Sequence, residues 1–171
     1  MNVFWVDGPW PGRLGIVPRP RGGDAWLINE AKAWRAAGID VVVSLLELAE
    51  AALLELEGEA AAAAEQSVVF RACPIPDGSI PPVREAVVDL IAELIDTLQG
   101  GNTVAVHCRQ SIGRSGLIVC AILVASGVDL VDALRIVAKS RGIEVPETDE
   151  QRQWLGEFAA WLASASASTE A

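Results

Sequence analysis

The residues best suited to chemistry are concentrated in one short segment, residues 107–115, which reads His-Cys-Arg-Gln-Ser-Ile-Gly-Arg-Ser. The apolar run Val104-Ala105-Val106 before it predicts a central strand, and the apolar residues 117–125 after it predict a buried helix. A tight loop that leads into a helix directs its backbone amides, and the positive end of the helix, at an anion. In such a field a cysteine thiol ionises readily, so we expect Cys108 to be a thiolate nucleophile.

The rest of this loop supplies groups that fit a phosphoryl anion. Arg114 lies six residues after Cys108, and its planar guanidinium can hold two phosphate oxygens. Gly113 allows the backbone to turn, and the hydroxyl of Ser115 can donate a hydrogen bond to the thiolate. The residues expected to bind the substrate phosphate are Arg109, Gln110, Ser111, Ile112, Gly113 and Arg114.

The pattern His-Cys-x5-Arg-Ser resembles the signature loop of the cysteine-dependent protein tyrosine phosphatases, especially the small dual-specificity group. The resemblance is sharp over about Cys73–Pro82 and His107–Ser126. It implies a phosphatase that forms a phosphocysteine intermediate and needs neither a metal nor another cofactor. It also implies that His107 supports the loop through hydrogen bonds and does not itself transfer the proton. The competing interpretation is a buried cysteine in an ordinary strand-to-helix turn.

A phosphoryl leaving group needs a proton, and Asp77 is the best candidate for the acid that supplies it. It lies in Cys73-Pro74-Ile75-Pro76-Asp77-Gly78, directly after a predicted strand, 31 residues before Cys108. The string Pro-Ile-Pro-Asp-Gly looks like the acid loop of the small members of that family. The alternative is that Asp77-Gly78 is only a turn.

Gln151 has two interpretations. In some members of the resembling family, a glutamine in a late loop orients the water that hydrolyses the phosphocysteine. Thr148-x-x-Gln151 also matches a helix capping box, with Thr148 as the N-cap residue. We favour the cap and keep Gln151 as a supporting residue of the site.

Three further residues could contribute to the site. Cys73 could approach Cys108 and form a protective disulfide, although packing in the core is the more common role of such a residue. Arg19 and Arg21 form a small basic patch that could steer a phosphorylated substrate, and the alternative is a solvated loop.

Short β-branched runs alternate with helical patterns, which predicts an α/β fold with a central, mainly parallel sheet of about four to five strands flanked by helices. Residues 1–162 should form one phosphatase domain, and residues 163–171 should form a flexible C-terminal tail. The predicted strands are 3–6, 14–17, 40–45, 68–72 and 103–106. The predicted helices are 25–37, one interrupted stretch over 47–65, 83–99, 113–126, 130–140 and 149–162. In the helix over 83–99, the apolar face comprises Val83, Val87, Leu90, Ile91, Leu94 and Leu98.

Composition limits the possible partners. The formal net charge is −10 over 171 residues, which argues against nucleic-acid binding. One histidine and three scattered cysteines give no zinc site and no disulfide framework, which favours a reducing cytoplasm. We expect no signal peptide, no membrane span and a monomer.

These observations predict a hydrolase of phosphomonoesters on proteins, acting on phosphotyrosine and also on phosphoserine or phosphothreonine. Two alternatives remain. One is a phosphatase for phosphoinositides or other small phosphate esters, and the other is a phosphate-binding module without catalysis.

Overall fold

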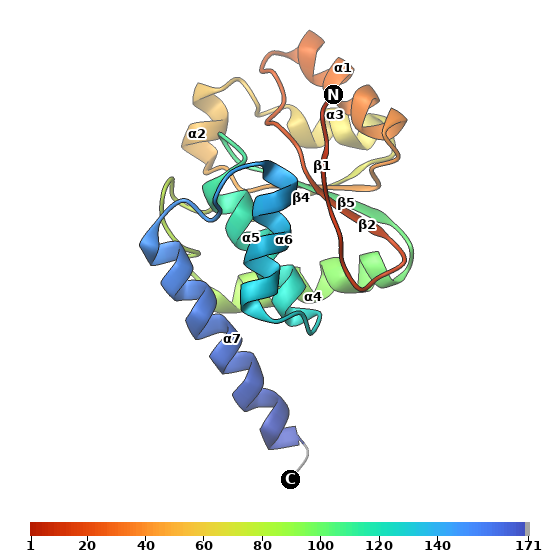
Figure 1. Ribbon diagram of the computed structural model, residues 1–171. Coiled ribbons are helices and arrows are strands. Elements are labelled where there is room, and N and C mark those ends of the chain that lie inside the picture. Colours follow the sequence, from red (N-terminus) through yellow and green to blue (C-terminus); the bar gives the residue numbers. More distant parts are fainter. Residues whose placement is uncertain (170–171) are drawn as a thin grey trace.

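The computed structural model describes the backbone of residues 1–169 and the side chains of residues 1–165 (Figure 1). The strands are β1 (Phe4–Val6), β2 (Arg13–Ile16), β3 (Val41–Ser44), β4 (Val69–Ala72) and β5 (Thr103–His107). The helices are α1 (Asp24–Ala36), α2 (Leu48–Leu53), α3 (Glu59–Glu65), α4 (Arg84–Gln99), α5 (Gly113–Ala125), α6 (Leu130–Arg141) and α7 (Asp149–Thr169).

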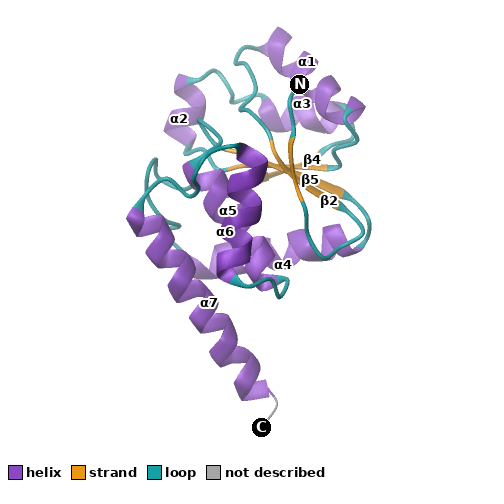
Figure 2. Cartoon of the chain, viewed as in Figure 1, coloured by secondary structure: helices purple, strands orange, loops and turns teal. Residues whose placement is uncertain are grey.

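The five strands form one sheet in the order β1-β2-β5-β3-β4. Figure 2 shows the strands in orange among the surrounding helices. Strands β2, β5, β3 and β4 are parallel, and only β1 runs antiparallel to its neighbour β2. The predicted α/β class and mainly parallel sheet are therefore confirmed. Because the central strands are parallel, the carboxyl ends of β3, β4 and β5 meet at one edge, where ligands bind in such sheets.

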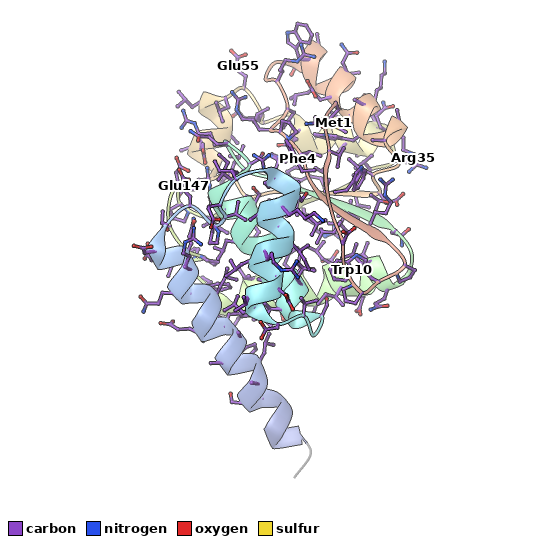
Figure 3. The ribbon with its side chains drawn as sticks, viewed as in Figure 1. Met1, Phe4, Trp10, Arg35, Glu55 and Glu147 are labelled. Atoms are coloured by element: carbon purple, nitrogen blue, oxygen red, sulfur yellow. The ribbon has the colours of Figure 1, made fainter. Side chains whose placement is uncertain are left out.

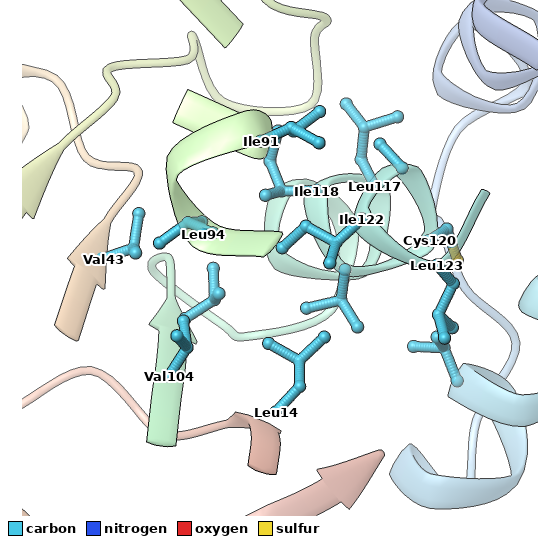
Figure 4. Close-up of a cluster of buried hydrophobic side chains, with 14 of the residues drawn as sticks. Leu14, Val43, Ile91, Leu94, Val104, Leu117, Ile118, Cys120, Ile122 and Leu123 are labelled. Atoms are coloured by element: carbon cyan, nitrogen blue, oxygen red, sulfur yellow. The ribbon is translucent and has the colours of Figure 1, made fainter. Parts of the chain in front are cut away.

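The two faces of the sheet carry separate cores, because side chains alternate along each strand. On β5, Val104 and Val106 join the larger core with α4 and α5 (Figure 4), whereas Ala105 joins the core beneath α1 and α3. Helix α5 lies at the centre of the larger core, and its residues from Gly113 to Leu123 are all buried. The loop that enters α5 from β5 is therefore fixed at both ends by buried elements.

The apolar face predicted for α4 is confirmed at five of its six positions, Val87, Leu90, Ile91, Leu94 and Leu98. Val83 is an exception: it precedes the helix as its N-cap and is 53% exposed. Because the backbone of Val83 is extended, with φ −127° and ψ 110°, its side chain does not continue the apolar face of the helix that begins at Arg84.

The predicted interruption of the stretch 47–65 is confirmed, and the break is longer than Gly58 alone: α2 ends at Leu53, Glu55 has a positive φ of 56°, and α3 begins at Glu59. One predicted boundary is corrected, because the helix predicted over 149–162 continues as α7 to Thr169. Alternating alanine and serine supports a helix here because alanine has the highest helix propensity. Residues 170–171 of the predicted tail lie outside the described residues.

Within the described part of the chain, no helix combines the length and the apolar character needed to cross a membrane.

Candidate active site

A pocket of about 240 Å³ opens at the carboxyl edge of the sheet. The predicted loop contributes Cys108, Gln110, Gly113 and Arg114, and the loop after β4 contributes Asp77 and Gly78. Glu147 and Thr148 complete the lining from the turn before α7. Three segments that are distant in the sequence therefore enclose the side chains predicted to do chemistry.

Cys108 lies at the base of this pocket and is 3% exposed. Its sulfur accepts a hydrogen bond from the backbone N–H of Ser111 at 3.2 Å, and the hydroxyl of Ser115 lies 3.5 Å from it. Both groups can donate to a thiolate, which is the role predicted for Ser115. The electrostatic environment agrees, because the Cys108 sulfur interacts favourably with the cations of Arg114 and Arg141.

The loop holds Ser111 in a left-handed conformation, with a φ of 57°. This conformation is costly for a residue other than glycine and persists only where the surroundings fix it. Here the Ser111 hydroxyl donates to the carbonyl of Val17 at 2.6 Å, and the backbone carbonyl of Ser111 accepts from the Arg141 side chain at 2.7 Å. These contacts hold the backbone N–H of Ser111 against the Cys108 sulfur.

Arg114 is 1% exposed and is held by partners from three other segments. Its guanidinium donates to both carboxylate oxygens of Glu50 on α2, at 2.7 and 2.9 Å. It also donates to the carbonyls of Leu45 and Ile75, at 3.4 and 2.9 Å. Burial by itself lowers the pKa of Arg114, but the hydrogen bond to Glu50 and the charge of Cys108 raise it above its ordinary value. The same hydrogen bond holds the pKa of Glu50 below its ordinary value.

Asp77 reaches the same guanidinium from the loop after β4. Its carboxylate lies 2.9 Å from Nη2 of Arg114, and its side chain is 65% exposed. The structure thus brings the predicted nucleophile, arginine and acid to one pocket. Because Asp77 is exposed on its other side, its carboxyl group can exchange Arg114 for a substrate oxygen.

Gln151 forms the capping box that its spacing predicts. Its backbone N–H donates to the Thr148 hydroxyl at 3.2 Å, and its side-chain oxygen accepts from the Thr148 N–H at 3.3 Å. Its amide nitrogen donates to the carbonyl of Ser79 at 2.9 Å, which ties the start of α7 to the acid loop. Gln151 is fully buried and does not line the pocket.

Glu147, close to that cap, does line the pocket. Figure 3 shows it at the turn before α7. It packs against Gly113, where an added Cβ would lie only 3.0 Å from a carboxylate oxygen of Glu147. Gly113 therefore allows the turn before α7 to close over the catalytic loop. The result is a second carboxylate, besides Asp77, beside a pocket built for an anion.

The other predicted loop residues have different positions. Arg109 is 43% exposed with its guanidinium 4.0 Å from Glu50, and Gln110 lines the pocket. Ile112 serves as the N-cap of α5 and packs against the core, and neither it nor Ser111 lines the pocket. The ring of His107 is fully buried and bonds to Glu59 at 2.7 Å, so it is absent from the pocket lining.

The basic patch predicted near the site is not part of the pocket. Arg21 pairs with Glu30 at 2.8 Å and stacks on Trp26, and Arg19 donates to the carbonyl of Pro20. All three contacts are local, as expected for a loop that leads into a helix.

All three cysteines are free thiols in this structure. Burial raises the pKa of Cys73, and it raises the pKa of Cys120 to about 12. Both thiols therefore ionise less readily than an exposed cysteine, which fits packing roles and makes Cys73 a poor partner for thiol exchange. Among the described residues, no group of three or more histidine, cysteine or acidic side chains could hold a metal ion.

Comparison with known families decides the classification of this site. Residues 21–128, more than half of the chain, match the family model described as Tc-R-P, the polymorphic toxin system DSP-PTPase phosphatase. The chain belongs to this family. It accordingly carries a domain of the dual-specificity protein tyrosine phosphatase class, and the matched range includes Asp77, Cys108 and Arg114.

Individual relatives of this DSP-PTPase agree with the classification. The chain is 39% identical over 70 residues to “Putative tyrosine phosphatase 123R” of Invertebrate iridescent virus 6, covering 40% of this chain and 49% of the relative. It is 32% identical over 108 residues to cyclin-dependent kinase inhibitor 3 of Mus musculus, covering 58% of this chain and 49% of the relative. The matches thus span about half the length of these curated relatives.

Solved structures share the fold. The kinase associated phosphatase (KAP) superposes with a TM-score of 0.84 at 17% identity, covering 95% of this chain and 96% of that one. Tk-PTP in its active form superposes with a TM-score of 0.73 at 27% identity, covering 92% and 96% of the two chains.

Sequence reasoning missed four charged residues of the site, Glu50, Glu59, Arg141 and Glu147. Glu50, Glu59 and Arg141 contact residues of the segment 107–115 from distant parts of the chain, and no local motif marks these three residues. Glu147 offered the one usable signal, because it lies directly before the capping box and so at a loop that faces the strand edge.

We predict that Glu50→Gln destabilises the fold by about 1.5–3 kcal/mol at pH 7, because it weakens charge-assisted hydrogen bonds to Arg114. The pKa of Glu50 is lower in the folded protein than its ordinary value of 4.5. The ionised group therefore stabilises the fold above about pH 4.5, and this contribution is lost as the pH falls through the lowered folded value. Urea unfolding at pH 7 and pH 3 should show a difference from wild type that shrinks in acid. Glu47→Gln, on the exposed start of α2, is the matched control, and an equal loss at both pH values would contradict the prediction.

We predict that Glu147→Gln tightens inhibition by inorganic phosphate roughly threefold to tenfold, because it removes a like charge from beside the anion. The gain should shrink at high salt, since screening already weakens that repulsion. Competitive inhibition constants at low and high ionic strength test this. Glu144→Gln, whose side chain is 85% exposed, should leave the inhibition constant unchanged.

Proposed function

We propose that this DSP-PTPase hydrolyses phosphomonoesters on protein side chains through a phosphocysteine intermediate. The observation that carries the proposal is that three groups meet at one pocket. They are the buried Cys108 with two hydrogen-bond donors beside its sulfur, the buried Arg114, and the exposed carboxyl group of Asp77. These are the nucleophile, anion clamp and acid that phosphoryl transfer requires.

In the first step, the Cys108 thiolate attacks phosphorus, so that an S–P bond forms as the P–O bond to the leaving group breaks. Arg114 and the loop amides bind the equatorial phosphate oxygens. The protonated Asp77 gives its proton to the departing oxygen. A phosphate dianion that takes over the guanidinium of Arg114 displaces Asp77 from its ion pair, so that the Asp77 carboxyl group is free to face the leaving oxygen.

In the second step, a water oxygen attacks phosphorus and the S–P bond breaks. The Asp77 carboxylate accepts the proton of that water, and the phosphate leaves as inorganic phosphate. Ser115 eases this step by donating a hydrogen bond to the departing thiolate, from its position 3.5 Å from the sulfur.

The pocket favours a phosphoryl group carried on a larger molecule. Its volume of about 240 Å³ is below the range of roughly 300–1,000 Å³ typical of pockets that enclose small ligands. No aromatic residue is among its lining residues, so no ring selects phosphotyrosine by stacking. These features support a phosphoprotein substrate and activity on phosphoserine or phosphothreonine as well as phosphotyrosine.

A substrate panel separates this proposal from its alternatives. Phosphopeptides should be hydrolysed faster than soluble phosphoinositides or sugar phosphates at equal concentration. Faster hydrolysis of the phosphoinositides would identify them, rather than phosphoproteins, as the substrate class. Phosphopeptide binding without turnover would indicate a binding module. We further propose that the enzyme works in a reducing cytoplasm as a monomer, because three buried free thiols need no oxidised partner.

We predict that the wild-type protein hydrolyses an aryl phosphate in the presence of EDTA, and that Cys108→Ser lowers the turnover by more than roughly a thousandfold. The hydroxyl of serine is a far weaker nucleophile than a thiolate. Steady-state assays with p-nitrophenyl phosphate measure this, with Cys73→Ser as the control that keeps turnover. Normal turnover by Cys108→Ser would refute the assignment of the nucleophile.

We predict that Asp77→Asn lowers kcat roughly 100-fold or more for phenyl phosphate and far less for p-nitrophenyl phosphate, because only the poorer leaving group needs a proton. Plots of rate against leaving-group basicity should therefore steepen in this variant. Asp149→Asn, an exposed acid at the start of α7, serves as the control. An equal loss for both substrates would argue against an acid role for Asp77.

A further inference from the structure

A buried acid and the only histidine of the chain form a pair behind the catalytic loop. Nε2 of His107 lies 2.7 Å from a carboxylate oxygen of Glu59, and the two side chains are 0% and 3% exposed. Neither residue lines the catalytic pocket. The mechanism proposed above gives this pair no step.

The pair lies on the opposite face of the sheet from the nucleophile. Alternation along β5 places Val106 and Cys108 in the core with α4 and α5, and Ala105 in the core with α1 and α3. His107 continues the second series and meets Glu59, the first residue of α3. The imidazole therefore lies outside the pocket in which a substrate phosphate would bind.

Glu59 is the group that fixes the imidazole ring. The other ring nitrogen, Nδ1, is buried and has no hydrogen-bond partner among the described residues. The orientation of His107 and the proton on its Nε2 thus depend on one carboxylate.

The surroundings of Glu59 favour a charged partner. Two acidic side chains lie close to the start of α3: Glu57 lines the same surface groove as Glu59, and a carboxylate oxygen of Asp24 lies near Gly58. A buried carboxylate in this setting needs a counter-charge, and His107 is the partner that can supply it. The free-energy cost of leaving Nδ1–H of His107 without an acceptor is smaller than the cost of leaving the ionised carboxylate of Glu59 unpaired.

We propose that Glu59 is a positioning residue of the active site, which keeps His107 as an imidazolium and so places a fixed positive charge one residue before Cys108. This charge adds to those of Arg114 and Arg141, the cations that already interact with the sulfur. It favours the thiolate that attacks phosphorus. The proposal rests on the phosphatase function argued above, and it assigns the origin of the reactivity of its nucleophile.

The single histidine makes the first test direct, since every imidazole signal in the spectrum belongs to His107. In ¹⁵N-labelled wild-type protein at pH 7, both ring nitrogens should show the chemical shifts of protonated nitrogen. Glu59→Gln should lose one of the two ring protons, and Glu57→Gln, an exposed neighbour, should keep both. A wild-type spectrum with one unprotonated ring nitrogen at pH 7 overturns the proposal without the use of any variant.

The second test follows the reactivity of Cys108. The rate at which iodoacetamide alkylates Cys108, measured by mass spectrometry of the peptide that contains it, should fall about tenfold at pH 6 in Glu59→Gln and converge with wild type in alkali. The kcat/KM for p-nitrophenyl phosphate should show the same displacement of its acidic limb, with the dependence on the leaving group unchanged. Coincident pH profiles for Glu59→Gln and Glu57→Gln would overturn the proposal.

These measurements separate the two proposals. If the wild-type protein shows the imidazolium spectrum and Glu59→Gln shows the displaced alkylation profile, but the wild-type protein turns over no phosphate ester, the phosphatase function fails and the role of Glu59 stands. If turnover is normal and neither signal depends on Glu59, the role of Glu59 fails and the phosphatase function stands.

Discussion

The site depends first on the burial of one guanidinium, that of Arg114. A buried cation is tolerated only when counter-charges and acceptors surround it. Here Glu50 supplies the counter-charge from α2, and the carbonyls of Leu45 and Ile75 supply acceptors from the loops after β3 and β4. Arg114 therefore links the segments that form the pocket. The same contacts fix the orientation of its guanidinium, which is the group that a phosphate would meet. Catalytic geometry and local folding rest on the same contacts.

This arrangement explains how a chain with a net charge of −10 can bind an anion. The phosphate meets a local field, which comes from Arg114, the loop amides and the positive end of α5, and not the charge of the whole surface. Two carboxylates, Asp77 and Glu147, line the same pocket and oppose that field. In the mechanism proposed above, this loss of affinity for phosphate accompanies the acid role of Asp77, because a group that gives a proton to the leaving oxygen must lie close to the anion.

Much of the fold could be predicted from local patterns, since each predicted strand overlaps an observed one and the apolar face of α4 matches except at Val83. Cys108, Arg114 and Ser115 could be predicted together because one loop carries them and their spacing fixes their geometry. Asp77 required the further step that parallel strands end at a common edge. Helix boundaries were less predictable, since the turn at Glu55 and the continuation of α7 to Thr169 depend on context rather than on composition.

The chemistry of the loop could be predicted from local sequence, because a strand, a cysteine, an arginine six residues later and a helix start all lie within one short segment. Which acids contact the side chains of this loop depends on the folded arrangement of distant segments. Residues 47–65 contain six glutamates in an alanine- and leucine-rich stretch, and nothing in their spacing distinguishes them. Glu50 reaches Arg114 across 64 residues, and Glu59 reaches His107 across 48. Those pairings follow from the place of β5 beside β3 and from the face of β5 to which each side chain points, and both are properties of the assembled sheet.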